Sequence, residues 1–262
     1  MIKFFRKIRQ HVLSEGKFGT YFKYAIGEII LVVIGILIAL QLNDWNDSRK
    51  QVALENEYYC RLLEDAKLDK EQIAHLLELA ENRLIASNQS VRLLLQEHVQ
   101  KIEVGTQLSL STKAIYSDFA PNNSAYEDLK SGANLNIISD KSVITALNRY
   151  FNKVEELKSI IMINGKHAVD ISFSHSDYFA NGAIQASIKD GRFKTGLDQD
   201  LKEIITAIDN DKISTEMTLR LLNESLEYVG ANTRQIELYS VMLTEIGSLE
   251  SVLQSKCQDD IN

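Results

Sequence analysis

Residue types that carry out enzyme chemistry do not occur in this sequence at the spacings that active-site motifs require. The sequence has five histidines, His11, His75, His98, His167 and His175. They form no HxxxH or HExxH pattern, so no helix-borne metal site is indicated. His167 and His175 lie close to Asp170 and Asp177, but a solvated polar helix face explains this group more simply. With no phosphate-binding glycine loop and no nucleophile elbow, we expect a protein that is not an enzyme, with no catalytic, cofactor-binding or metal-binding residue.

One acidic residue, Glu28, lies in the most apolar part of the chain. Residues 24–42 read YAIGEIILVVIGILIALQL. A carboxyl group about one turn into hydrocarbon is costly unless it is neutral, paired or in an interface. Glu28 shares a helical stripe with Val32, Gly35 and Ala39, where small residues let a second helix approach. We interpret Glu28, Gly35 and Ala39 as a helix interface. Two alternatives stay open: Glu28 reaches the cytoplasmic interface near Lys23, or it is a proton or cation site.

Aromatic and amide side chains gather between residues 116 and 136. The candidates for a recognition surface are Tyr116, Phe119, Asn122, Asn123 and Tyr126. Loop residues of these types often bind ligands. The alternative is that they cap helices and fill the end of a helical bundle.

Two cysteines, Cys60 and Cys257, are too few for a disulfide framework and too far apart for a CxxC motif. If the last helix returns alongside the first, both cysteines lie near the membrane-proximal base. A disulfide is then possible in an oxidising periplasm. The alternative is two separate thiols.

The element that must position Glu28 is a transmembrane helix over residues 24–42. Nineteen residues rise about 28 Å as a helix, close to the ~30 Å hydrocarbon thickness of a bilayer. The run from Ile29 to Leu40 has no polar side chain, which is rare in a buried soluble helix. A cleavable signal peptide is another alternative to a membrane span, but the following residues, QLNDWNDS, contain no pair of small residues at cleavage spacing. Trp45 follows the span where interfacial aromatics are common.

Charge gives the expected orientation. Residues 1–23 carry six Lys or Arg against one Glu, while the whole chain has a net charge of −7. The positive-inside rule therefore places residues 1–23 in the cytoplasm, as an amphipathic segment on the anionic leaflet or as a disordered basic tail. The remaining chain is acidic, which disfavours nucleic acid as a partner. We expect a bacterial inner-membrane location, with residues 43–262 as a periplasmic domain.

The periplasmic domain is predicted to be all-α, because the chain has one proline and helical periodicity throughout. A seam of apolar residues from Leu63 to Leu94 predicts a helix over about 54–100. Gly105 is expected to break the pattern before a short helix at 114–119. Ser124 and Glu127 resemble a capping box, and Gly132 a helix stop. Ser139 or Asp140 can cap the next helix, whose predicted core residues are Val143, Ile144, Leu147, Tyr150, Phe151, Val154, Leu157 and Ile161.

Further helices are predicted over 168–184 and 198–208, with breaks at Gly165, Asn181-Gly182 and 189–195. The last long helix is predicted over 214–255, with Leu222, Leu226, Val229, Ile236, Leu243 and Ile246 as buried candidates. It is long enough to return alongside the first helix. We therefore expect an antiparallel bundle of two long helices and several shorter ones.

Two blocks carry a family resemblance. FFRKIRQ with YAIGEIILVVIGILIALQLNDWN, and later SAYEDLKSGANLNIISD with Asn148, Tyr150 and Phe151, resemble a family of single-pass proteins of unknown function from Gram-negative bacteria of the Bacteroidota type. The resemblance implies an inner-membrane protein with a periplasmic domain. It implies no activity, cofactor or catalytic residue.

These observations favour a non-enzymatic scaffold or accessory subunit of a membrane assembly. Its expected partners are the lipid bilayer and either a second copy or another membrane protein, contacted through the Glu28 stripe and the surface of the bundle. The alternatives are a periplasmic ligand-binding sensor module and an ion-pathway subunit that uses Glu28.

Overall fold

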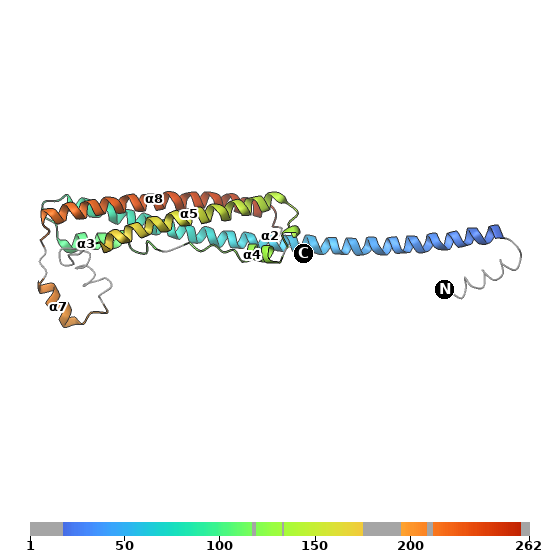
Figure 1. Cartoon of the computed structure of the whole chain (residues 1–262), viewed down its shortest axis with the longest axis horizontal. Coiled ribbons are helices and arrows are strands. Elements are labelled where there is room, and N and C mark those ends of the chain that lie inside the picture. Colours follow the sequence, from blue (N-terminus) through green and yellow to red (C-terminus); the bar gives the residue numbers. More distant parts are fainter. Residues whose placement is uncertain (1–17, 117–118, 133, 175–194, 209–211, 258–262) are drawn as a thin grey trace. The chain divides into compact units, whose positions relative to one another are not determined.

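The structure is a computed structural model that describes residues 18–116, 119–132, 134–174, 195–208 and 212–257 (Figure 1). Every regular element in these ranges is a helix, as the sequence predicts. The elements are α2 (Phe18–Leu94), α3 (Lys101–Ser111), α4 (Ser124–Ser131), the 3-10 helix η1 (Asn134–Ile137), α5 (Lys141–Phe173), α7 (Gln199–Ile208) and α8 (Thr215–Gln254). The predicted amphipathic segment, up to residue 17, and the predicted helix beyond residue 174 lie outside the described residues.

The chain divides into two compact units, Met1–Asn56 and Glu57–Asn262. Among the described residues, α2 is the one helix that is long and apolar enough to cross a membrane, and its most apolar stretch lies in the first unit. None of its most apolar stretch is buried. Ile29, Val33 and Leu37, for example, are 63%, 47% and 54% exposed. An apolar surface of this length needs a non-aqueous environment or a partner.

In the second unit, α2 and α8 run antiparallel. As the residue number increases along α2, the number of the residue that it contacts in or just after α8 decreases. Cys60 is bonded to Cys257, Lys70 pairs with Glu250 at 2.7 Å, and Ser90 Oγ donates to Ser225 Oγ at 2.8 Å. The register is therefore fixed along the whole length that the two helices share. The return of the last helix alongside the first is confirmed.

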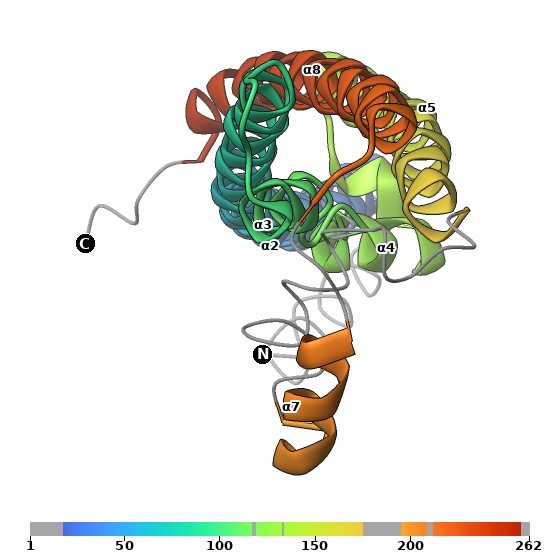
Figure 2. The ribbon, with the colours of Figure 1, turned by 90° about the vertical axis from the view of Figure 1, so that its left-hand side faces the viewer.

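A third long helix, α5, lies along the other side of α8 (Figure 2). Arg149 pairs with Glu245 at 2.9 Å, and Asn164 Nδ2 donates to the carbonyl of Ala231 at 2.6 Å. These contacts also run in opposite directions, so α5 is antiparallel to α8. The expectation of only two long helices was wrong, because Gly165 does not break α5. The helix has 33 residues and buries Gly165 within it.

The core of the second unit contains aliphatic and aromatic side chains from α2, α4, α5 and α8. On α5, the predicted core residues are confirmed, with Ile144 and Phe151 partly buried at its edge. On α8, the predicted boundaries are confirmed but part of the predicted face was wrong. Leu226 is 52% exposed, while Glu224 and Ser225 are buried. Polar residues therefore occupy the inner face of this half of α8.

Between residues 95 and 123 the prediction was wrong in two places. Gly105 lies inside α3 and is buried there, so it does not interrupt a helix. Residues 112–116 form a turn, where a short helix was predicted. Side chains of the long helices determine the conformation here. The backbone carbonyl groups of Ser111 and Lys113 accept hydrogen bonds from Asn232 and Arg83.

Candidate functional site

A buried guanidinium group, Arg83 on α2, is the centre of the most polar cluster in the bundle. Arg83 is 4% exposed. Its Nε donates to Asn232 Oδ1 at 2.8 Å and its Nη2 to Gln235 Oε1 at 2.6 Å, both on α8. Burial lowers the pKa of Arg83, as expected for a cation removed from water. Amide oxygens, which carry partial negative charge, therefore compensate this cation across the α2–α8 contact.

The same cluster binds the turn that follows α3. Asn232 Nδ2 donates to the carbonyl of Ser111 at 3.0 Å, and Arg83 Nη1 to the carbonyl of Lys113 at 3.4 Å. The C-terminal end of a helix carries partial negative charge, which suits a buried cation. Ala114, in this turn, has a positive φ of 55°, a conformation that costs about 1 kcal/mol for a residue with a side chain. We conclude that Arg83 and Asn232 hold a strained turn in the bundle.

Gly165 on α5 provides the space in which this turn packs. A Cβ atom at Gly165 would lie 3.0 Å from the backbone oxygen of Ile115 and 3.5 Å from Gln235 Nε2. The same Nε2 is buried without a hydrogen-bond partner. The glycine is therefore required for close approach of backbone to backbone, and not for a break in the helix.

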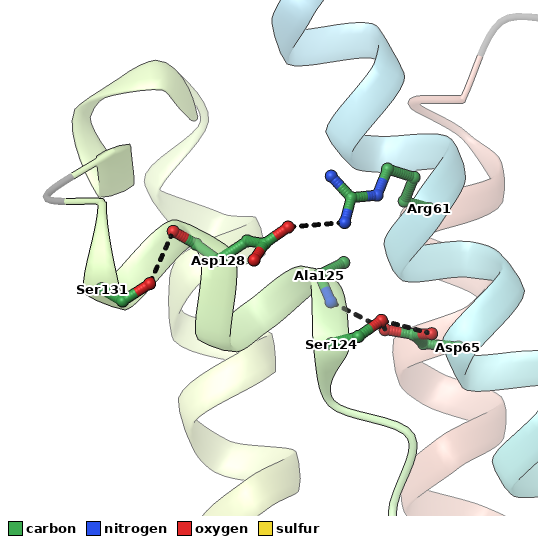
Figure 3. A network of polar contacts seen from close by, with 6 residues as sticks. All are labelled: Arg61, Asp65, Ser124, Ala125, Asp128 and Ser131. Carbon is green, nitrogen blue, oxygen red and sulfur yellow. Dashed lines mark hydrogen bonds and ion pairs between the residues drawn. The ribbon is translucent and has the colours of Figure 1, made fainter.

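A second polar cluster fastens the segment 119–131 to α2. Three residues on one face of α2, Arg61, Asp65 and Asp69, each hold a different part of this segment. Arg61 Nη2 donates to Asp128 Oδ2 at 2.6 Å, and Asp65 Oδ2 accepts from the backbone N–H of Ala125 at 3.1 Å (Figure 3). Asp65 therefore caps α4 from another helix. The predicted capping box was wrong, because the N-cap is Asn123 and no side chain of α4 caps it.

Asp69 is the most buried of these three α2 residues, at 1% exposed. Its Oδ1 accepts from the backbone N–H and the side-chain amide of Asn122 at 2.6 and 2.9 Å, and its Oδ2 accepts from Tyr150 Oη at 2.6 Å. Burial raises the pKa of Asp69, while these hydrogen bonds oppose the rise. Burial, with the nearby carboxylate, also raises the pKa of Tyr150. Asp69 thus joins α2, α5 and the segment between α3 and α4.

The five predicted recognition residues do not form one surface. Phe119 and Tyr126 are buried, at 1% and 8% exposed, because they pack in the core. Asn122 and Asn123 are partly buried, and Asn122 holds Asp69. Tyr116 alone is well exposed, at 56%. The alternative interpretation, that the group caps helices and fills the end of the bundle, fits these positions.

The sequence pattern held a signal for the polar residues that we did not identify. Asp69 and Arg83 occur at the three- and four-residue steps of the α2 seam that also includes Ala66, Ile73 and Ala80. A polar residue at a seam position is either an exception at the surface or a buried group with a partner. Ser87, another polar residue at a seam position, is buried and accepts a hydrogen bond from Asn232 Nδ2 at 3.1 Å.

The predicted membrane residues Glu28, Gly35 and Ala39 are all exposed along α2. A Cβ atom at Gly35 would meet nothing within 4 Å. Past the apolar stretch, the guanidinium carbon of Arg49 lies 5.2 Å from the centre of the Trp45 ring. The first unit therefore presents an apolar stretch with small residues on one side and a stacked Trp-Arg pair after it.

Cys60 and Cys257 form a disulfide with a Cα–Cα distance of 4.8 Å. The residue before Cys257, Lys256, pairs with Asp140 at 2.7 Å. Asp140 also caps α5, because its side chain accepts from the backbone N–H of Ser142. Two adjacent residues after α8 thus hold the other two long helices.

Other titratable groups do not converge on a metal site. In the described ranges, no group of three or more His, Cys, Asp or Glu is placed to hold a metal ion. His167 lies 3.5 Å from the exposed Glu227, while His175 and Asp177 lie outside the described residues. On α8, the buried Tyr228 hydroxyl donates to Glu224, and burial raises the pKa of Tyr228.

Comparison with known proteins gives a family and no closer relative. No curated protein and no solved structure matches the chain. One family model matches residues 28–208, a range that includes α2 from Glu28 onward and α3, α4, α5 and α7, and that ends before α8. The match covers Arg83, and it covers Arg61, Asp65 and Asp69 together with the segment 119–131 that they hold. The chain therefore belongs to the family described as a family of unknown function, DUF6090.

Proposed function

We propose that the protein is a non-enzymatic scaffold or accessory subunit, anchored in the bacterial inner membrane by α2 and carrying a periplasmic helical domain. The observation that carries this proposal is the exposed apolar stretch of α2, from which the helix continues without a break into the disulfide-closed domain. Lipid would solvate the exposed stretch, and the basic residues before it would stay in the cytoplasm.

The disulfide supports the periplasmic side. Structural disulfides form and persist in oxidising compartments and are rare in the cytosol. Cys60 follows the apolar stretch by eighteen residues in the sequence, so with the N-terminus inside it would lie on the periplasmic side. The bond joins both ends of the domain.

The domain's own contacts support a scaffold over an enzyme. Its buried polar groups are used in holding its own segments: Arg83 and Asn232 bind the turn after α3, and Asp69 binds the segment before α4. Polar networks of this kind fix one arrangement of helices. Phe119 and Tyr126, two of the five candidate recognition residues, pack in the core of the domain.

Assembly would use the stripe Glu28, Gly35 and Ala39 in contact with a second copy or another membrane protein. Small residues allow close helix approach, and Glu28 would be hydrogen-bonded in the contact. Cross-linking of the full chain in native membranes tests this. We expect a discrete cross-linked species that Glu28→Gln retains and that Glu28→Leu and Gly35→Leu abolish.

The matched control is Leu37→Phe, which changes bulk on the opposite side of the helix. It should leave cross-linking unchanged. Equal cross-linking in all four variants would rule out assembly through this stripe. Loss of an ion-dependent membrane function in both Glu28 variants, with assembly intact, would favour the ion-pathway alternative.

A further inference from the structure

We propose that Trp45 and Arg49 form a binding site for the phosphate of a phospholipid headgroup in the outer leaflet. The site rests on the proposed membrane span, because it uses the position of these residues relative to the end of the apolar stretch. Trp45 is 60% exposed, and the Arg49 guanidinium lies over its ring. A planar guanidinium is the side chain best suited to bidentate contact with phosphate.

The first step is the depth of the site. Leu42 is the last residue of the apolar stretch, and Trp45 follows it by about 4.5 Å along the helix axis. Arg49 is about 6 Å further along, but side chains on a helix point back toward its N-terminus. The cation–π contact, with the guanidinium carbon 5.2 Å from the centre of the Trp45 ring, shows that the Arg49 guanidinium is held close to Trp45. The headgroup layer extends about 5–7 Å beyond the hydrocarbon, so the guanidinium lies within it.

The second step is that no acid of this helix neutralises Arg49. Its neighbours at three and four residues are Trp45, Asn46, Val52 and Ala53, none of them acidic. In the described part of the chain, Arg49 forms no ion pair. A cation at the depth of the lipid phosphates is therefore available to them.

The adjacent lysine is different. Lys50 Nζ lies 3.5 Å from Asp47 Oδ1, and Asn43 Nδ2 donates to Asp47 Oδ2 at 3.1 Å. Lys50 is therefore partly neutralised within the helix, although it is one residue from Arg49 and carries the same charge. This makes Lys50→Gln a matched control for Arg49→Gln.

Trp45 is the chain's only tryptophan, so its fluorescence reports on this site alone. The full chain in dodecyl maltoside micelles, which contain no phosphate, is titrated with a phosphatidylglycerol brominated near the headgroup. A diacylglycerol with the same brominated acyl chains is the phosphate-free comparison. We expect saturable quenching of Trp45 by the phospholipid at a mole fraction about fivefold lower than by the diacylglycerol.

Arg49→Gln should abolish this preference and Lys50→Gln should retain it. Equal quenching of the wild type and Arg49→Gln by the phospholipid would overturn the phosphate site while leaving the membrane span in place. Absence of quenching by either lipid, in every variant, would show that Trp45 is not at a membrane. That result would overturn the proposed span as well.

Discussion

Cys257, three residues past the end of α8, is bonded to Cys60 near the start of the domain, 197 positions earlier in the sequence. The bond closes nearly the whole domain into one covalent loop. Because a cross-link restricts the unfolded chain, its stabilising effect increases with the length of the loop that it closes.

Reduction of this bond should therefore lower the free energy of unfolding by about 2–5 kcal/mol. The measurement is urea unfolding of the full chain in detergent, followed by circular dichroism, with and without dithiothreitol. Cys60→Ser with Cys257→Ser should match the reduced wild type and should not respond to dithiothreitol. An unchanged midpoint after complete reduction would contradict a structural role for the bond.

Arg83→Leu should destabilise the domain by about 3–5 kcal/mol, because it leaves Asn232, Gln235 and the carbonyl of Lys113 buried without their donor. Arg234→Leu is the matched control. Arg234 pairs with Glu237 on the exposed side of α8, so its loss should change stability by about 0.5 kcal/mol or less. Equal effects of the two substitutions in urea unfolding would mean that the buried cluster is not what holds the turn.

Gly165→Ala should lower stability by about 1–2 kcal/mol, since the new methyl group would press on the Ile115 carbonyl. Gly230→Ala and Gly247→Ala are controls on α8, where a Cβ atom meets nothing within 4 Å. In these open helical positions alanine should raise stability by about 0.5–1 kcal/mol. Thermal unfolding of the three variants distinguishes the two signs, and a stabilising Gly165→Ala would refute the close approach.

Asp69 should give a pH dependence opposite to that of a salt-bridged aspartate. Burial raises its pKa in the folded chain, so the folded state binds a proton more readily than the unfolded state. The contribution of Asp69 to stability is then greater below the unfolded pKa and is lost as pH rises through the folded pKa. The wild type should gain stability relative to Asp69→Asn as pH falls from 7 toward 4. A constant difference across this range would contradict the raised pKa.

The long helices could be predicted from the sequence because their signals are local. Ser214 and Asp140 are good caps, and the apolar steps on α5 continue from Val143 to Ile161. The failures occurred where a distant residue decides the local structure. Gly165 looks like a break until Ile115 is known to pack on it. Ser124 looks like a cap until Asp65 of α2 is known to accept from the backbone N–H of Ala125 at the start of α4.

The polar core was the least predictable part. Arg83 and Asn232 are separated by 149 positions, and each alone resembles a surface residue on a long helix. The pairing of α2 with α8 brings them together, and periodicity cannot give the register of that pairing. The disulfide was only one of two alternatives for the same reason: it depends on where α8 ends relative to α2.

The central claim is that lipid solvates the apolar stretch of α2 and that the helical domain lies on the outer side. External protease added to spheroplasts with an intact inner membrane tests it, with a tag after Asn262 and immunodetection of both the tag and a cytoplasmic marker. We predict that the tag is lost, that the marker survives, and that the uncut chain leaves the membrane only with detergent. Protection of the tag until the membrane is broken, or recovery of the full chain in the soluble fraction, would contradict the claim.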